Sequence, residues 1–190
     1  MNRKERTISE TMEKLMVDQI ARELYNHNVY RTYANYYYVR GLFKLYLYYE
    51  MRSNEEYNHH QWIVDRLYRA GVDFNYPEVP AVKANHVILK PEDSFQKVVD
   101  LEIETTMYIN KMIETAKEEK DWQTEGWLKR TLNEEQMEEE DISRTIQAMA
   151  EEDTDWQTKE DTILSYYNNL NRVTEGDRDI IDNSSFLKQR

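Results

Sequence analysis

The sequence predicts an all-α protein: a four-helix bundle in which a long crossover joins helices two and three, plus a short C-terminal fifth helix. Three observations predict this architecture. Only four Gly and three Pro occur in 190 residues, too few turn residues for an all-β chain. Apolar residues recur at helical spacing over four long segments. One stretch, residues 71–90, shows no sustained period and is unusually long for a connection in a compact domain.

The first two helices are delimited by a cap and two glycines. Residues 7–10, Thr-Ile-Ser-Glu, have capping-box spacing and open a helix that runs to about Tyr38. Gly41 marks a short turn. The second helix covers roughly residues 43–70 and stops at Gly71, which can serve as its C-cap. The short connection predicts an antiparallel hairpin.

The second pair of helices follows the crossover. Proline and acids at residues 91–93 open the third helix, which runs to about Lys120. A brief joint near Asp121 leads to the fourth helix, at about residues 123–151. Because the crossover returns the chain to the starting end, helices two and three are predicted to run parallel, as in crossed four-helix bundles.

A shorter apolar stretch, Thr162 to Leu170, predicts the fifth helix. Residues 1–171 are therefore expected to form one helical domain, and residues 172–190 a polar C-terminal tail. No run of about 18 apolar residues suggests a membrane span, and the first ten residues lack the apolar core of a signal peptide.

Composition excludes several classes of function. The chain has no cysteine, which excludes disulfides, thiolate-bound metal sites and thiol catalysis and suits a reducing cytoplasm. The formal net charge of −12 disfavours a nucleic-acid partner, because nothing could neutralise a row of phosphates. It favours cations or basic partners.

Every one of the four long helices carries acid on its core-facing stripe near mid-length. Buried charges cost several kcal/mol each, by rough estimate, unless they are compensated. Arg52 is the one Lys or Arg on these stripes at that level, so a bound cation, or two, is the simplest compensation. The residues on these lines are Glu23, His27 and Tyr30 in the first helix, Glu56 and His59 in the second, Glu102 and Thr105 in the third, and Glu135 with Glu138 or Glu139 in the fourth.

The spacing within the second helix indicates metal chemistry. Glu56 and His59 form a Glu-x-x-His motif, which places a carboxylate and an imidazole one turn apart, as in di-iron carboxylate bundles. The fourth helix offers Glu135 and Glu138 at the same spacing but no histidine. One metal would thus have a nitrogen ligand and the other only oxygens, which suits Fe(II), and also Mn or, less specifically, Zn. His27 could be an extra ligand, although a satisfied core histidine is the commoner case.

With these residues in place, the chain resembles the non-haem bacterial ferritins over about residues 10–171. The matching stretches are ARELYNHNVY (21–30), NEEYNHHQW (54–62), DRLYRAG (65–71), INKMIETAKEEKDW (109–122) and NEEQMEEED (133–141). The ordered ligand set across four helices is the specific part of this resemblance. Tyr57 stands where a bacterioferritin would carry a haem-ligating methionine, so no haem is expected.

The resemblance implies a ferritin-like fold, with residues 1–171 as the di-iron domain, and a role for each acid. Glu23, Glu56 and His59 would hold the first ferroxidase iron, and Glu56 would bridge to a second iron. The remaining implied roles are Glu102 and Glu138 on that second iron, Tyr30 as the neighbouring hydrogen-bond partner or one-electron donor, and Glu55 with Glu134 at an accessory third iron position.

The register of the fourth helix has two alternatives. An ungapped alignment puts Glu135 where many relatives carry glutamine, which predicts an extra carboxylate at the second iron. Sliding the register by one residue restores the family's Glu-Gln pair as Glu135-Gln136 but moves Gln136 off the apolar stripe. The apolar stripe favours the ungapped register, with Glu135 and Glu138 as ligands.

The function implied is iron storage with ferroxidase activity. Two Fe²⁺ ions would bind within the bundle, react with O₂ or H₂O₂, and pass to a mineral inside a cytoplasmic cage of 24 copies. No membrane and no nucleic-acid partner are expected. Two alternatives remain open: a di-iron or iron–manganese oxidase that stores nothing, and a non-catalytic cage protein.

Overall fold

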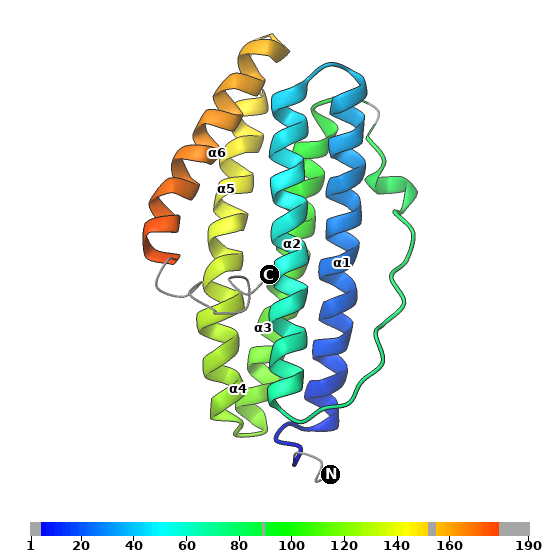
Figure 1. Ribbon diagram of the computed structural model, residues 1–190, viewed down its shortest axis with the longest axis vertical. Helices are drawn as coiled ribbons and strands as arrows, with labels where there is room; N and C mark the ends of the chain where they lie inside the picture. Colours follow the sequence, from blue (N-terminus) through cyan, green and yellow to red (C-terminus); the bar gives the residue numbers. More distant parts are fainter. Residues whose placement is uncertain (1–4, 89, 152–154, 179–190) are drawn as a thin grey trace, which may run out of the picture.

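The computed structural model is a helical bundle in the residues that it describes, which are 5–88, 90–151 and 155–178. Four long rods lie side by side, and a fifth helix leans against them (Figure 1). No strand occurs in these ranges, and none of their helices is long and apolar enough to cross a membrane. The predicted fold class, a ferritin-like bundle with a crossover and a fifth helix, is confirmed.

Helices α1 (Glu10–Val39) and α2 (Phe43–Arg69) form the first antiparallel hairpin. Ser9 caps α1, because its hydroxyl accepts a hydrogen bond of 2.9 Å from the Met12 amide. Gly41 closes the hairpin with a φ of 75°, a left-handed conformation that side chains other than glycine's adopt at a cost. The chain direction between the two helices is thereby reversed within a few residues.

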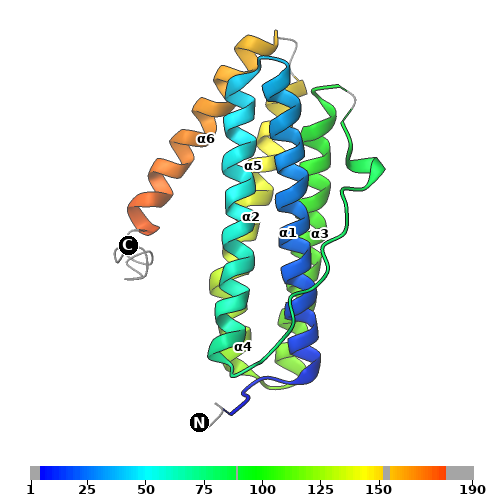
Figure 2. The same cartoon turned by 45° about the vertical axis from the view of Figure 1, so that its right-hand side comes forward.

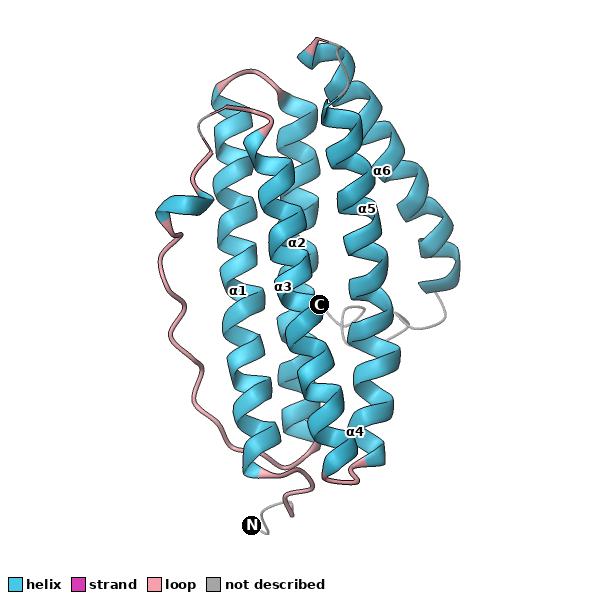
Figure 3. Ribbon diagram, turned by 180° about the vertical axis from the view of Figure 1, so that it is seen from behind, coloured by secondary structure: helices cyan, strands magenta, loops and turns pink. Residues whose placement is uncertain are grey.

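The crossover runs along the outside of α1 for most of the bundle's length (Figure 3). It contains one short 3₁₀ turn, η1 (Ala84–His86), which is fixed to α1 by a hydrogen bond of 2.6 Å between the Tyr25 hydroxyl and His86 Nδ1. The crossover delivers the chain to the start of α3 (Asp93–Glu118), which runs parallel to α2 (Figure 1). The parallel arrangement predicted for helices two and three is therefore present.

The fourth rod is not one continuous α-helix. It begins as α4 (Trp122–Trp127), passes through a π-helical segment, η2 (Leu128–Asn133), and continues as α5 (Glu134–Glu151). π-helical turns use i→i+5 hydrogen bonds and so take up about one residue more per turn than an α-helix. This segment changes which residues of α5 face the interior.

Helix α6 (Trp156–Arg178) is longer than predicted. It contacts α2 and α5 and leans away from the bundle axis at its far end (Figure 2). Residues 172–178, expected to belong to a polar tail, continue this helix. The rest of the expected tail, residues 179–190, lies outside the described residues.

Two hydrophobic clusters fill the bundle. The cluster near the α1–α2 turn is rich in tyrosine, and the opposite one is aliphatic. Large members of the first are Tyr30, Tyr33, Tyr37, Tyr48 and Tyr49, and of the second Met12, Met16, Ile20, Ile63 and Leu67. Between the two clusters lies a level of buried polar side chains, which contains the candidate site.

Candidate metal centre

Four buried carboxylates, one from each rod, meet at this level. Glu23 of α1, Glu56 of α2, Glu102 of α3 and Glu139 of α5 expose at most 3% of their surface. His59, one turn after Glu56, is 4% exposed. The bundle therefore converges anionic oxygens and one imidazole in a region shielded from water, where charge is expensive unless it is compensated.

Glu23, Glu56 and His59 form the first group, which we name the histidine trio. One ligand atom from each lies within 4.8 Å of the others, a spacing that a single metal ion can bridge. Neutral amides support it: Gln19 Nε2 donates to Glu23 Oε1 at 2.5 Å, and Asn26 Nδ2 donates to Glu56 Oε2 at 3.4 Å. The other oxygens, Glu23 Oε2 and Glu56 Oε1, are buried and accept no hydrogen bond from the described residues.

Glu56, Glu102 and Glu139 form the second group, the carboxylate trio, in which one oxygen from each residue again lies within 4.8 Å of the others. The Arg52 guanidinium already lies against it. Arg52 Nη2 is 2.5 Å from Glu102 Oε1, and Nη1 is 3.3 Å from Glu139 Oε1. Arg52 is itself 1% exposed, so these are ion pairs in a low-dielectric interior rather than screened surface contacts.

Glu102 receives two further hydrogen bonds. The Tyr30 hydroxyl donates to its Oε1 at 2.6 Å, and Gln136 Nε2 donates to its Oε2 at 2.7 Å. With Arg52, three donors from three different elements hold this carboxylate. Both of its oxygens are thus engaged, unlike those of Glu23 and Glu56.

Burial dominates the protonation of the centre. It raises the pKa of Glu23 to about 7, with hydrogen bonds from its neighbours opposing the shift. Burial, and then the charges of Glu102 and Glu23, raise the pKa of Glu56 well above its ordinary value. Burial also raises the pKa of Glu139, although Arg52 opposes it. Burial alone would lower the pKa of Arg52, but Glu139 and Glu102 outweigh it and raise that pKa.

The structure differs from the expected register in the fourth rod. Gln136 and Glu139 are buried at 3% each, whereas Glu135 is half-buried and Glu138 is exposed. The π-helical segment explains the difference, because its extra residue moves the inward position after Leu132 from Glu135 to Gln136. The preference for the ungapped register, with Glu135 and Glu138 facing inward, is therefore corrected. The inward residues are Gln136 and Glu139, as in the register shifted by one residue.

Glu135 and Glu138 still lie near the centre. With Glu55, they line a cavity of about 340 Å³ between α2, α5 and α6, which Arg52 and Glu139 also line. Glu135 also forms a third group with His59 and Glu139 within the same 4.8 Å limit. Glu134, expected at an accessory position, is exposed and belongs to none of these groups.

The sequence did not single out several of the supporting residues. Gln19 lies one turn before Glu23 and Asn26 one turn after it, so helical spacing alone could have identified both. His27 is used structurally, since its Nδ1 lies 2.8 Å from the Ser53 carbonyl and hydroxyl oxygens. It is in none of the candidate metal groups among the described residues.

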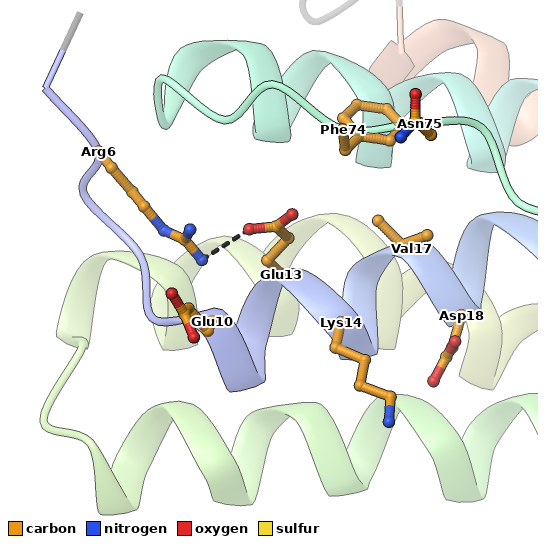
Figure 4. Close-up of a pocket in the computed structure, with 8 residues that line it drawn as sticks. All are labelled: Arg6, Glu10, Glu13, Lys14, Val17, Asp18, Phe74 and Asn75. Carbon is orange, nitrogen blue, oxygen red and sulfur yellow. Dashed lines mark ion pairs between the residues drawn. The ribbon is translucent and has the colours of Figure 1, made fainter.

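A second surface cavity lies at the start of α1, far from the carboxylates. It measures about 430 Å³ and is lined by the N-terminal segment, α1 and the crossover residues Phe74 and Asn75 (Figure 4). Arg6 and Glu13 form an ion pair of 2.6 Å across it. Its charges are mostly exposed and of both signs, so the buried centre is the stronger candidate site.

Comparisons with known proteins agree with this geometry. Structural matches include an open-pore ferritin from the hyperthermophilic archaeon Archaeoglobus fulgidus, with 25% identity and a TM-score of 0.72 over 83% of this chain and 98% of that one. An engineered closed form of the A. fulgidus ferritin matches at 27% identity and a TM-score of 0.73, over 84% of this chain and 97% of that one. A humanized archaeal ferritin matches at 26% identity and 0.71, over 75% and 85%.

A search of curated proteins found no match. The family model described as ferritin-like domain matches residues 13–151, which include every member of both trios and all of the four rods except the first turn of α1. Because this match spans well over half of the chain, the protein belongs to the ferritin-like domain family.

Proposed function

We propose that the protein is a ferroxidase that stores iron: its buried centre binds two Fe(II), passes their electrons to O₂ or H₂O₂, and releases Fe(III) to a mineral. The observation that carries this proposal is the charge balance of the centre. Four buried carboxylates face a single buried guanidinium, and two oxygens of the histidine trio accept no hydrogen bond from the described residues. Divalent cations would supply the missing positive charge.

Each trio suits one iron. Glu23, Glu56 and His59 would hold the first Fe(II) through two carboxylates and a nitrogen, and Glu56 would be shared with a second Fe(II) at Glu102 and Glu139. Gln136, rather than Glu135, would lie beside the second iron, with its amide on Glu102. The donor set contains no thiolate and is rich in oxygen, which fits Fe(II). Glu55, Glu135 and Glu138 around the 340 Å³ cavity would offer an accessory cation position.

The electron count requires both irons. Two Fe(II) lose one electron each, and together with two protons they reduce one O₂ to H₂O₂ or one H₂O₂ to two waters. The bundle would fix the separation of the two metals and exclude bulk water. Tyr30 would orient Glu102, because its hydroxyl donates to that carboxylate.

Storage implies assembly. The proposed form is a closed homo-oligomeric cage, of 24 copies as in many ferritins, acting in the cytoplasm. Helix α6 would then line a symmetry axis, and the net charge of −12 would draw Fe²⁺ toward the cage and offer nucleation sites. The likeness to solved archaeal ferritins at 25–27% identity supports this assembly.

The test is to add Fe(II) aerobically to the purified chain, follow ferric absorbance, and size the product by light scattering and electron microscopy. Fast oxidation of two irons per chain, followed by accumulation of many more in a hollow particle, is the expected result. Oxidation no faster than in the protein-free buffer would refute the ferroxidase. Oxidation that stops at two irons per chain would refute storage and favour a non-storage oxidase.

A further inference from the structure

Arg52 is a buried cation that the proposed function leaves without a role. It lies on α2 one turn before Glu56 and is 1% exposed, and its guanidinium contacts carboxylates from three elements. Burying a guanidinium is expensive, so its position has to be explained by what it compensates. No other Lys or Arg among the described residues forms an ion pair with either trio.

The contacts of Arg52 are restricted to one side of the centre. It pairs with Glu102 and Glu139, two of the three members of the carboxylate trio, and it forms no ion pair with Glu23 or Glu56. A guanidinium nitrogen 2.5 Å from Glu102 Oε1 occupies the space that a cation bound to that oxygen would need. A metal ion and the guanidinium therefore cannot both sit between Glu102 and Glu139.

We propose that Arg52 is the resident counter-ion of the carboxylate trio, so that the two cation positions fill in order. The first divalent cation binds the histidine trio, and the second binds the carboxylate trio only when the guanidinium withdraws. This inference rests on the proposed function, because it assumes that both trios take metal.

The surroundings of Arg52 show where the guanidinium can go. Its Nη1 is 2.9 Å from Glu55 Oε2, and Glu55 faces the 340 Å³ cavity, which Arg52 also lines. Other acids line the same cavity, so a displaced guanidinium would stay among carboxylates. Its Nε donates to no described residue, which leaves the present position incompletely satisfied and lowers the cost of withdrawal.

Ordered filling has a chemical consequence. A chain that holds one Fe(II) at the histidine trio can supply one electron, whereas reduction of O₂ to H₂O₂ takes two. While Arg52 stays in place, the singly loaded chain cannot complete that reduction by itself. Arg52 thereby sets the Fe(II) concentration at which the two-electron reaction starts.

The first experiment measures binding of Zn²⁺ alone, a redox-inert probe, to the metal-free full-length chain by titration calorimetry. The wild type should bind one tight equivalent per chain and a second one at least about a hundredfold more weakly, as expected for an ion that must break a buried ion pair. The variant Glu56→Gln alters both trios, so the Zn²⁺ that it still binds measures binding by surface acids. Mn²⁺ should give the electron paramagnetic resonance signal of an isolated ion at one equivalent, and a spin-coupled pair only in excess.

Substitutions of Arg52 then test whether this residue causes the difference in affinity between the two Zn²⁺ equivalents. Arg52→Met keeps the approximate length of the side chain without its charge and should bind two tight equivalents. Arg66→Met is the matched control, because Arg66 is also a buried arginine of α2 but donates to Thr124 at 2.8 Å, away from both trios. It should bind as the wild type does. Arg52→Lys covers the case in which Arg52→Met does not fold, and its second affinity should exceed that of the wild type.

The outcomes separate this inference from the proposed function. Two equally tight equivalents in the wild type would overturn the inference and leave the metal centre intact. A second equivalent that stays as weak in Arg52→Met or Arg52→Lys as in the wild type, or that tightens equally in Arg66→Met, would also overturn it. Absence of any tight equivalent in the wild type and in the Arg52 variants would overturn the proposed function and the inference together.

Discussion

The two trios share Glu56 but compensate their charge in opposite ways. In the histidine trio, neutral amides hold Glu23 and Glu56, and one oxygen of each accepts no hydrogen bond from the described residues. In the carboxylate trio, a guanidinium, a phenol and an amide saturate Glu102. The same guanidinium lies 3.3 Å from Glu139, whose oxygens accept no hydrogen bond from the described residues. The first arrangement lacks positive charge, whereas the second already contains it.

Similar donor atoms therefore do not make the two proposed metal positions equivalent. In both trios, one ligand atom from each residue lies within 4.8 Å of the others. What distinguishes them is the free energy of the state without metal, which the neighbours of each carboxylate determine. Variants of these neighbours should therefore change the two sides in opposite directions.

The largest change in stability is expected when the carboxylate trio of the metal-free chain loses its guanidinium. Arg52→Met leaves Glu102 and Glu139 buried without their cation and should lower the free energy of unfolding by about 3–5 kcal/mol. Urea unfolding in the presence of a chelator measures it. Arg66→Met loses a hydrogen bond to a neutral hydroxyl and should cost less, about 1–2 kcal/mol. Equal losses in the two variants would contradict the comparison.

The histidine trio should respond with the opposite sign. The pKa of Glu23 is raised from 4.5 to about 7, so the folded chain binds this proton more tightly than the unfolded chain does. Stability is then complete below pH 4.5 and is lost as pH rises through 7. Glu23→Gln removes this loss and should stabilise the metal-free chain at pH 8 by up to about 3 kcal/mol.

The control for this pH dependence is Glu114→Gln, which makes the same substitution at an exposed position of α3. It should leave the dependence of stability on pH between 5 and 8 as in the wild type, within about 0.5 kcal/mol. If Glu23→Gln is no more stable than the wild type at pH 8, Glu23 is not an uncompensated charge, and the contrast between the trios fails.

Much of the fold was predictable because it depends on local signals. The cap at Ser9, the positive φ at Gly41 and Gly71, and the aperiodic crossover each have a clear sequence signature. The extent of α6 was less predictable, since its polar last turns carry no apolar periodicity. Tertiary packing determines where such a helix ends, and the sequence pattern of the helix alone does not predict it.

The site was predictable where helices are regular. Glu23, Glu56, His59 and Glu102 were expected on inward faces, and the structure buries all four. The prediction of the inward face of the fourth rod was wrong by one residue. The π-helical segment before Glu134 interrupts the 3.6-residue period on which that prediction depended. Periodicity placed Arg52 at the right level but could not show that its guanidinium points to Glu102 and Glu139.

Two glutamines, one beside each trio, allow the Zn²⁺ affinity of each trio to be changed separately, with an effect of intermediate size. Gln19→Leu removes the amide from Glu23 and should weaken the first Zn²⁺ equivalent, and Gln136→Leu removes it from Glu102 and should weaken the second. Supporting hydrogen bonds of this kind change metal affinity about 10–100-fold. Titration calorimetry on both variants gives the two affinities. A variant that weakens both equivalents alike would show that the sites do not separate along these lines.

A substitution in the contact between α1 and the crossover should have the smallest effect on stability. It tests whether the difference between the two trios depends only on residues of the centre. Tyr25→Phe removes the hydrogen bond to His86 that fixes the crossover to α1 and should cost about 1 kcal/mol, without changing either Zn²⁺ affinity. Burial lowers the pKa of His86, with Glu104 and Asp100 opposing the shift and Lys83 and Lys97 adding to it. The unfolded chain therefore binds this proton more tightly, and stability is lost as pH falls below 6.5, opposite to the Glu23 dependence. Limited proteolysis of residues 71–90 should accelerate toward pH 5 in the wild type. A change in Zn²⁺ affinity in Tyr25→Phe would mean that the crossover, and not local charge compensation, tunes the trios.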